Sequence, residues 1–249
     1  GSVPGTAPAL PITKEYYYGQ TVTVESHAAQ DAVLDQTFAG WHTLDKTTVT
    51  DEMTEFTMPM GNITLYGIFT IKENVPFHIH HYLQNTDGSY PDTPNYTGTA
   101  HAVAGTAKFA SDFIRTISGY TYAPDAAGSV KQGVVSENPT LTLKLYYTRN
   151  PYNVTYKYEG TVPAGATDLT SYQKIGVPYG TSVTVGGNAT ALGYAFSGWR
   201  VEVPDDAVIT DGKFTMPAGN VVLVGSFTAR TNTPYRIEYY WQNVEGDGY

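Results

Sequence analysis

The chain of 249 residues contains no cysteine, which excludes both a disulfide framework and a metal site built on thiolates. Charged residues make up only 15% of the sequence. The acidic side chains outnumber the basic ones by 23 to 14, which gives a formal net charge of -9 at pH 7. Because an acidic chain without basic clusters repels phosphate backbones, the composition argues against a nucleic-acid partner.

Long apolar runs are also missing. No stretch approaches the roughly 18 apolar residues of a transmembrane helix, so we expect no membrane insertion within this segment. The sequence carries no signal peptide or sorting tail, and we expect it to be a piece of a longer protein. With 25 Gly, 21 Tyr and many Thr and Val, it predicts strands joined by tight turns and suits an exported bacterial surface protein.

The most informative feature that is present is an internal repeat. The letters FAGW at 38–41 return as FSGW at 196–199, and FTMPMGN at 56–62 returns as FTMPAGN at 214–220. The offset is 158 residues in both cases. A fixed offset over this much chain predicts a tandem array of similar modules, which is a different object from an enzyme with one active site.

Three segments share an opening strand in which apolar and aromatic residues alternate with polar ones, as in a strand with one buried face. Each begins with a proline, where the missing N–H costs no ladder hydrogen bond. They divide the chain into a first type A module that lacks its opening strand (1–74), a type B module (75–150), a second type A module (151–231), and the opening strand and turn of a further type B module (232–249).

We expect the repeated aromatic residues to form the module cores. A buried Trp removes roughly 200 Å² from water, worth about 5 kcal/mol as an upper bound. The glycine before each Trp is interpreted as a position where a neighbouring strand or ring approaches closely. Stacking of the Trp rings on carbohydrate is the alternative. The expected core residues are Phe38, Trp41, Phe56, Phe69, Phe196, Trp199, Phe214 and Phe227.

The type B module shows its own local signals. Residues 85–88 predict a hairpin turn, and residues 141–147 alternate as a strand does. Phe109 and Phe113 are spaced as on one face of a helix, which predicts a short amphipathic helix over 107–114. The whole chain is expected to be mainly β, with one short helix or helical turn in each module.

The motifs resemble two families of bacterial surface repeats. Residues 193–199 (GYAFSGW) and 62–69 (NITLYGIF) in type A resemble the internalin B-repeat (Listeria–Bacteroides repeat) family. Residues 81–88 (HYLQNTDG) and 118–121 (SGYT) in type B are similar to the MucBP repeats of Gram-positive surface proteins. The resemblance implies a mainly β (α+β) fold, with small β-grasp, ubiquitin-like modules in an elongated array, and it carries no catalytic residue.

Candidate chemistry is sparse. His78 and His80 would share a strand face, a spacing that metals use, with His81 beside them. Because the matching positions are 153, 155 and 156 in one copy and 236, 238 and 239 in the other, an array-wide metal site is excluded, and only a private site stays open. Acidic pairs at 51–52 and 205–206 and the acidic turns at 87–88 and 245–248 are interpreted as solvated loops. We expect no cofactor, no metal and no enzyme activity.

The tyrosines leave two interpretations open. Tyr pairs and triplets at 16–18, 146–147 and 239–240 exceed what small cores need. They could form stiffening cross-strand ladders or a recognition surface.

These observations predict a non-catalytic repeat segment of a bacterial cell-surface adhesin. It would act as a semi-rigid stalk that presents a distal binding region, outside the cell and attached to the wall through parts not in this chain. The alternative is a direct mucin or glycan binder that uses exposed Tyr and Trp. We also predict self-association by strand exchange, in which the terminal strand fills the place of the strand missing from the first type A module. Its candidate contacts are Tyr235, Ile237, Tyr239 and Trp241.

Overall fold

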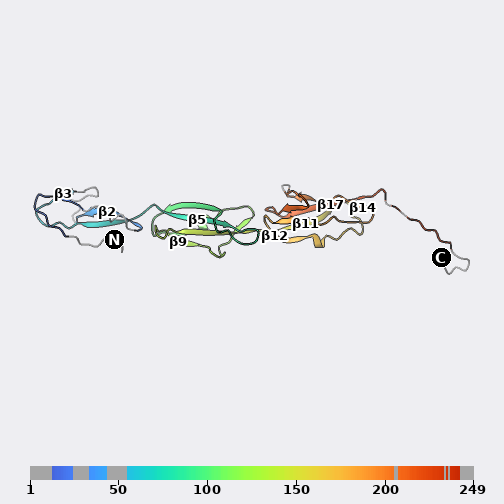
Figure 1. Ribbon diagram of the computed structural model, residues 1–249, viewed down its shortest axis with the longest axis horizontal. Coiled ribbons are helices and arrows are strands. Elements are labelled where there is room, and N and C mark those ends of the chain that lie inside the picture. Colours follow the sequence, from blue (N-terminus) through green and yellow to red (C-terminus); the bar gives the residue numbers. More distant parts are fainter. Residues whose placement is uncertain are drawn as a thin grey trace. The chain divides into compact units, whose positions relative to one another are not determined.

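The computed structural model describes residues 13–24, 34–43, 55–204, 207–232, 234 and 236–241. These residues form seventeen strands and two short 3₁₀ helices, so the fold is mainly β, as predicted. The chain divides into two compact units, and Figure 1 labels strands of each: β2, β3, β5 and β9 in unit 1, and β11, β12, β14 and β17 in unit 2. Unit 1 contains residues 1–116 and 121–148, and unit 2 contains residues 117–120 and 149–249. The boundary predicted between residues 74 and 75 lies inside unit 1.

The first type A module forms two small antiparallel sheets within unit 1. Strand β1 (Thr21–Thr23) pairs with β3 (Glu55–Thr57), and β2 (Gln36–His42) pairs with β4 (Tyr66–Ile71). Aromatic and β-branched side chains fill the space between them because such side chains pack well on a pleated surface. The buried residues of this core are Val24, Phe38 and Trp41.

The type B module contains a four-stranded sheet in the spatial order β6 (Tyr96–Ala102), β5 (Val75–Leu83), β10 (Thr142–Arg149) and β8 (Tyr120–Tyr122). The two central strands, β5 and β10, are the first and the last of the module, and they run parallel. Strand β6 is antiparallel to β5. Every second residue of β10 is buried, as expected for a strand with one face on the core.

The segment predicted as an amphipathic helix in the type B module is instead a strand followed by a 3₁₀ turn. Strand β7 (Ala107–Phe109) pairs antiparallel with β9 (Gln132–Val134), and η2 (Ala110–Phe113) follows. Pairing with β9 supplies the backbone hydrogen bonds that a helix would have supplied, so the spacing of two Phe residues does not decide the structure. The other described helix is η3 (Thr170–Tyr172). Neither helix has the length or apolar character needed to cross a membrane.

The second type A module, in unit 2, has the same kind of central pair. Its opening strand β11 (Pro151–Glu159) runs parallel to its closing strand β17 (Val221–Ala229). Antiparallel strands flank this pair: β12 lies beside β11, whereas β14 and β15 lie beside β17, and β13 and β16 form a separate antiparallel pair. The bounds of these strands are β12 Lys174–Pro178, β13 Ser182–Thr184, β14 Tyr194–Phe196, β15 Arg200–Val203 and β16 Lys213–Thr215.

The two type A modules fold in the same register, which confirms the tandem repeat. Phe38 lies opposite Phe69 in the first copy, and Phe196 lies opposite Phe227 in the second. Likewise, His42 faces Tyr66 and Arg200 faces Val224, again at an offset of 158 residues. A sequence that repeats at a fixed offset therefore repeats its strand pairing.

The glycines around the Trp motif have two different roles. Gly40 and Gly198 have φ values of 111° and 85°, a left-handed backbone that favours glycine, and nothing lies within 4 Å of a Cβ placed on Gly198. The prediction of close approach at this position is wrong there. Close approach occurs across the sheet instead, where a Cβ would lie 2.8 Å from Phe38 at Gly67 and 2.2 Å from Phe196 at Gly225. These two glycines leave room for the phenyl rings.

Candidate functional site

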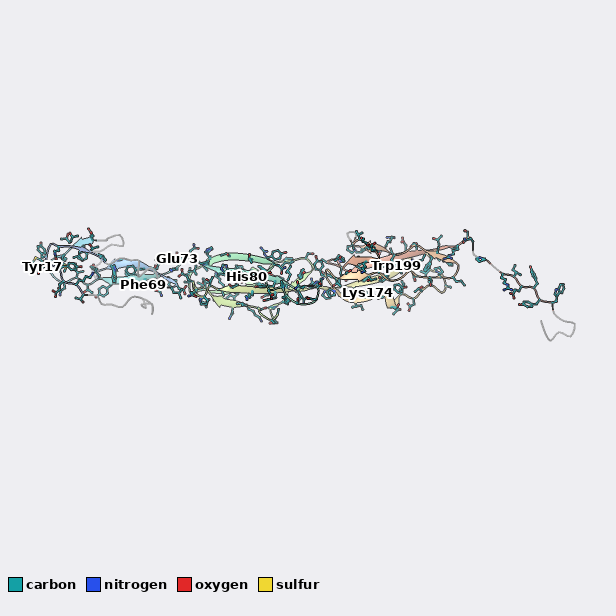
Figure 2. The ribbon with its side chains drawn as sticks, in the orientation of Figure 1. Tyr17, Phe69, Glu73, His80, Lys174 and Trp199 are labelled. Atoms are coloured by element: carbon teal, nitrogen blue, oxygen red, sulfur yellow. The ribbon has the colours of Figure 1, made fainter. Side chains whose placement is uncertain are left out.

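An aromatic cluster surrounds Trp199, one of the expected core residues. The indole packs edge-on against Tyr156 at 5.0 Å between ring centroids, stacks on Tyr158 at 6.0 Å and meets Phe196 at 4.8 Å. Its Nε1 donates a hydrogen bond to the carbonyl of Gly187 at 2.9 Å. Figure 2 shows Trp199 among the strands of unit 2. Because rings of the module itself contact the indole, this geometry favours a core role over carbohydrate stacking.

The remaining predicted core residues differ in how deeply they are buried. Phe38, Trp41 and Phe214 are buried, with exposed fractions of 6%, 8% and 3%. The others are half-buried and pack at the edges of the cores; these are Phe56, Phe69, Phe196, Trp199 and Phe227. Half-buried core residues are expected in modules this small, because small modules bury only a limited fraction of their surface.

The Trp of the first type A module lacks one contact that its counterpart has. The indole Nε1 of Trp41 is buried and has no hydrogen-bond acceptor among the described residues. The residue that matches Gly187, the acceptor for Trp199, is residue 29, which lies outside the described ranges. Trp41 still packs edge-on against Phe38 at 5.2 Å, and Phe38 packs against Phe69 at 5.3 Å.

The histidines of β5 are divided between the two faces of the sheet. The rings of His78 and His80 share one face, with their centroids 6.2 Å apart, as strand geometry predicts. His81 points to the opposite face and is buried, with its Nδ1 3.0 Å from the hydroxyl oxygen of Tyr147. Within the ranges that the structure describes, no three His, Cys, Asp or Glu side chains come together as metal ligands.

His81 belongs to a buried hydrogen-bond chain. The backbone N–H of Arg115 donates to the Tyr147 oxygen at 2.9 Å, so the Tyr147 hydroxyl is free to donate to Nδ1 of a neutral His81. Burial lowers the pKa of His81, and the positive charges of Arg115 and His80 lower it further. Burial also lowers the pKa of His80, together with the charges of His78 and Lys144. The site therefore holds His81 in its neutral form as part of the fold.

The described tyrosines occupy three kinds of position: cross-strand contacts, the core and the exposed surface. Tyr146 stacks on Tyr82 of the neighbouring strand, with ring centroids 4.6 Å apart and an interplanar angle of 12°, which is a cross-strand contact. Tyr147, the next residue, is buried in the core, since successive strand residues point to opposite faces. By contrast, Tyr17 and Tyr18 are 82% and 75% exposed. Figure 2 labels Tyr17 in the first type A module.

Two amide side chains that sequence reasoning missed hold the opening strand of the second type A module. Asn220 Oδ1 accepts the N–H of Asn153 at 2.8 Å. Gln173 accepts the N–H of Tyr156 at 3.0 Å and donates to its carbonyl at 3.1 Å, next to the irregular register between β11 and β12. The role of Asn220 could have been suspected from the sequence, because the Gly-Asn dipeptide at 219–220 also occurs at 61–62. Nothing in the sequence marks Gln173.

Of the remaining candidates, those that the structure describes are a turn residue and exposed residues near the C-terminal end. Asp87 accepts hydrogen bonds from the backbone N–H and hydroxyl of Ser89, which lower the pKa of its carboxyl and make it a turn residue. Residues 51–52, 205–206 and 245–248, and Tyr235, lie outside the described residues. The three other terminal candidates are in no strand and are strongly exposed; they are Ile237 at 71%, Tyr239 at 86% and Trp241 at 95%.

If the Trp199 cluster is core, Trp199→Ala lowers the free energy of unfolding of unit 2 by about 3 kcal/mol, at the lower end for Trp because the ring is half-buried. Chemical denaturation followed by near-UV circular dichroism measures this change. A glycan-array screen of the same variant supplies the contrary outcome: unchanged stability with lost glycan binding would assign Trp199 to a binding surface.

The same cluster is tested from the opposite strand by Gly225→Ala. The added Cβ would lie 2.2 Å from the Phe196 ring, so the ring must move and stability must fall. Gly219→Ala is the matched control, because nothing lies within 4 Å of a Cβ at that position. Equal effects of the two substitutions would contradict the packing described here.

The lowered pKa of His81 predicts an acid-sensitive type B module. Below the unfolded-state pKa of about 6.5, His81 binds a proton in the unfolded chain but stays neutral in the folded module. Stability is therefore lost as the pH falls from about 7 towards the lowered folded-state pKa, where the loss levels off. His81→Gln keeps an acceptor for Tyr147 and should lose less stability than the wild type between about pH 7 and 5. His101→Gln, at an exposed position of β6, is the control, and parallel curves for all three proteins would refute the prediction.

Comparison with known proteins adds family information. No curated protein matches the chain. Among solved structures, Streptococcal High Identity Repeats in Tandem (SHIRT) domains 3-4 from a cell surface protein match with 10% sequence identity and a TM-score of 0.20, covering 62% of this chain and 99% of that chain. The sequence profile of the divergent InlB B-repeat domain matches residues 4–73 and again residues 152–231, together more than half of the chain. Two such repeats are consistent with a non-catalytic repeat segment of a bacterial cell-surface protein. The chain therefore belongs to the divergent InlB B-repeat family.

Proposed function

We propose that this chain is a semi-rigid stalk segment of a cell-wall-attached adhesin of a Gram-positive bacterium. Its β-grasp-like modules, of which the type B module is MucBP-like, would form an elongated array and hold a distal binding region away from the cell. The work of the segment is then mechanical, and each module must resist tension applied through its two ends. Adhesion itself would belong to the distal region.

The observation that carries this proposal is the parallel pairing of first and last strands. In the type B module, β5 pairs with β10 over six residue pairs, and in the second type A module β11 pairs with β17 over another six. Tension on the ends of such a module pulls two parallel neighbours in opposite directions along their length. All hydrogen bonds between them are then loaded together in shear and cannot break one after another.

Short connections between modules support the semi-rigid character. Strand β10 ends at Arg149 and β11 begins at Pro151, so a single residue separates them. Strand β4 ends at Ile71 and β5 begins at Val75. The proline at position 151 fixes its own φ and restricts the residue before it, which limits the freedom of the connection.

Force spectroscopy tests the proposal on unit 2, and the absence of native cysteine permits attachment at introduced cysteines. The pair Asn150→Cys and Thr231→Cys loads β11 and β17 in shear, whereas Thr161→Cys and Thr231→Cys pulls the same strands apart from one end. We expect a severalfold higher unfolding force in the first geometry. Equal forces in the two geometries would remove the mechanical basis of the proposal.

Direct binding of mucin or another glycan is the second candidate. The observation in its favour is the exposure of Tyr17 and Tyr18, which leaves two rings available to a sugar. The glycan-array screen described for Trp199→Ala decides it when the full chain is included: specific binding by the wild type supports this function, and no binding leaves the stalk role alone.

Self-association by strand exchange is also proposed. Among the described residues, β4 pairs with β2 only, whereas its counterpart β17 also pairs with β11. Tyr66 and Ile68 of β4 are accordingly 46% and 43% exposed, although the matching Val224 is fully buried. The terminal residues 236–241 of a second copy, with their alternating apolar side chains, are a strand of the type that this edge accepts.

Analytical ultracentrifugation measures this association. We expect a concentration-dependent dimer that is lost in the double variant Ile237→Asp and Tyr239→Asp, because charges on the exchanged strand would have to be buried. Thr231→Asp, outside the segment, is the control. A chain that stays monomeric at all concentrations, or a dimer that survives the double variant, would contradict strand exchange.

A further inference from the structure

A polar contact inside unit 1 connects the first type A module to the type B module. The carboxylate of Asp35, in the turn before β2, accepts the backbone N–H of Glu137 at 2.7 Å and the hydroxyl of Ser136 at 2.7 Å. Ser136 and Glu137 lie in the loop between β9 and β10 of the type B module. One carboxylate of the first module thus binds two donors of the next.

The contact is reciprocal and includes the connecting segment 72–74, which Glu73 marks in Figure 2. The Glu137 carboxylate receives the ammonium of Lys72 at 2.7 Å and the N–H of Asp35 at 3.5 Å. The carbonyl of Lys72 accepts the N–H of Ala104 at 2.8 Å. Each side therefore supplies both donors and acceptors, and the hydrogen bonds to charged groups are the stronger kind.

The second type A module shows what this position is like without the contact. Gly193 occupies the place of Asp35, and the backbone hydrogen bond is the same in both copies. The backbone N–H of Lys72 donates to the Asp35 carbonyl at 3.0 Å, and the backbone N–H of Arg230 donates to the Gly193 carbonyl at 2.8 Å. The φ values are 62° for Asp35 and 80° for Gly193. Glycine adopts this left-handed conformation without strain, whereas aspartate pays a penalty there.

A strained aspartate where glycine would fit needs an offsetting gain, and the two hydrogen bonds from the type B loop supply it. We infer that Asp35 is a docking residue that fixes the type B module on the first type A module, with the Ser136–Glu137 loop as its partner surface. A type A module with aspartate at this position fixes the type B module that follows it, and one with glycine lacks this docking contact. The inference rests on the proposed stalk function, since it states where such a stalk is stiff.

The test is Asp35→Gly in the full chain, followed by NMR amide exchange and ¹⁵N relaxation. Glycine suits the backbone, so the amides of β2 and β4 should stay protected. The Glu137 amide should exchange about tenfold faster or more, because it loses a charged acceptor. The first type A and type B modules should also change from common to separate tumbling. Ser136→Ala weakens the contact from the other side and leaves the first module untouched, should Asp35→Gly disturb it.

Gly193→Asp is the matched control, because it places the same side chain in the same turn of the other copy. It should leave Glu137 exchange unchanged. Unaltered Glu137 exchange and common tumbling in both Asp35→Gly and Ser136→Ala would overturn the inference. That outcome is separable from failure of the stalk proposal, since the force measurement uses cysteines in unit 2 and does not involve Asp35.

Discussion

The pairing of the first strand of a module with its last strand is the constraint on which the rest of this structure depends. In the type B and second type A modules, the two parallel strands occupy the centre of the sheet, and antiparallel strands are added on their outer edges. Because parallel neighbours need a long crossover, everything between them must fold back across the sheet. The short helices η2 and η3 and the FxGW motif of the second type A module lie in these crossovers. The same pair connects the two ends of the module through a row of hydrogen bonds, so the fold and the proposed mechanical role have one origin.

Comparison of the two type A copies shows which features follow from the repeated sequence and which depend on the neighbouring strands. Both copies share the strand register, the left-handed glycine before the Trp, and the glycine beneath the phenyl ring. The environment of the closing strand differs: Leu223 is fully buried beside β11, whereas the matching Leu65 is only half-buried. Similar local sequence thus gives the same strand register, whereas the burial of a side chain also depends on whether another strand lies alongside. This is why the strand-exchange proposal concerns β4 and not β17.

The sequence was a good guide wherever the signal is local or duplicated. The alternation at 141–147, the turn at 85–88 and the FxGW repeats predict features that the structure shows. The helix expected over 107–114 fails because Ala107 and Phe109 pair with β9, a partner more than twenty residues away. Long-range side-chain contacts could not be predicted from the sequence for the same reason. Gln173 and Asp35 are ordinary polar residues in sequence, and only the fold shows which backbone groups they bind.

In the proposed stalk, two different kinds of interaction would set the stiffness. Within a module, the hydrogen bonds between the parallel strands would share an applied tension, so no single side chain would decide the unfolding force. Between the first type A and type B modules, a few charged hydrogen bonds between partly exposed groups hold the contact, and each counts. The partly exposed Lys72–Glu137 ion pair contributes little alone, but the Asp35 carboxylate adds hydrogen bonds from the Ser136 hydroxyl and the Glu137 N–H. Substitution at one turn position, Asp or Gly, could therefore tune bending while the modules themselves stay the same.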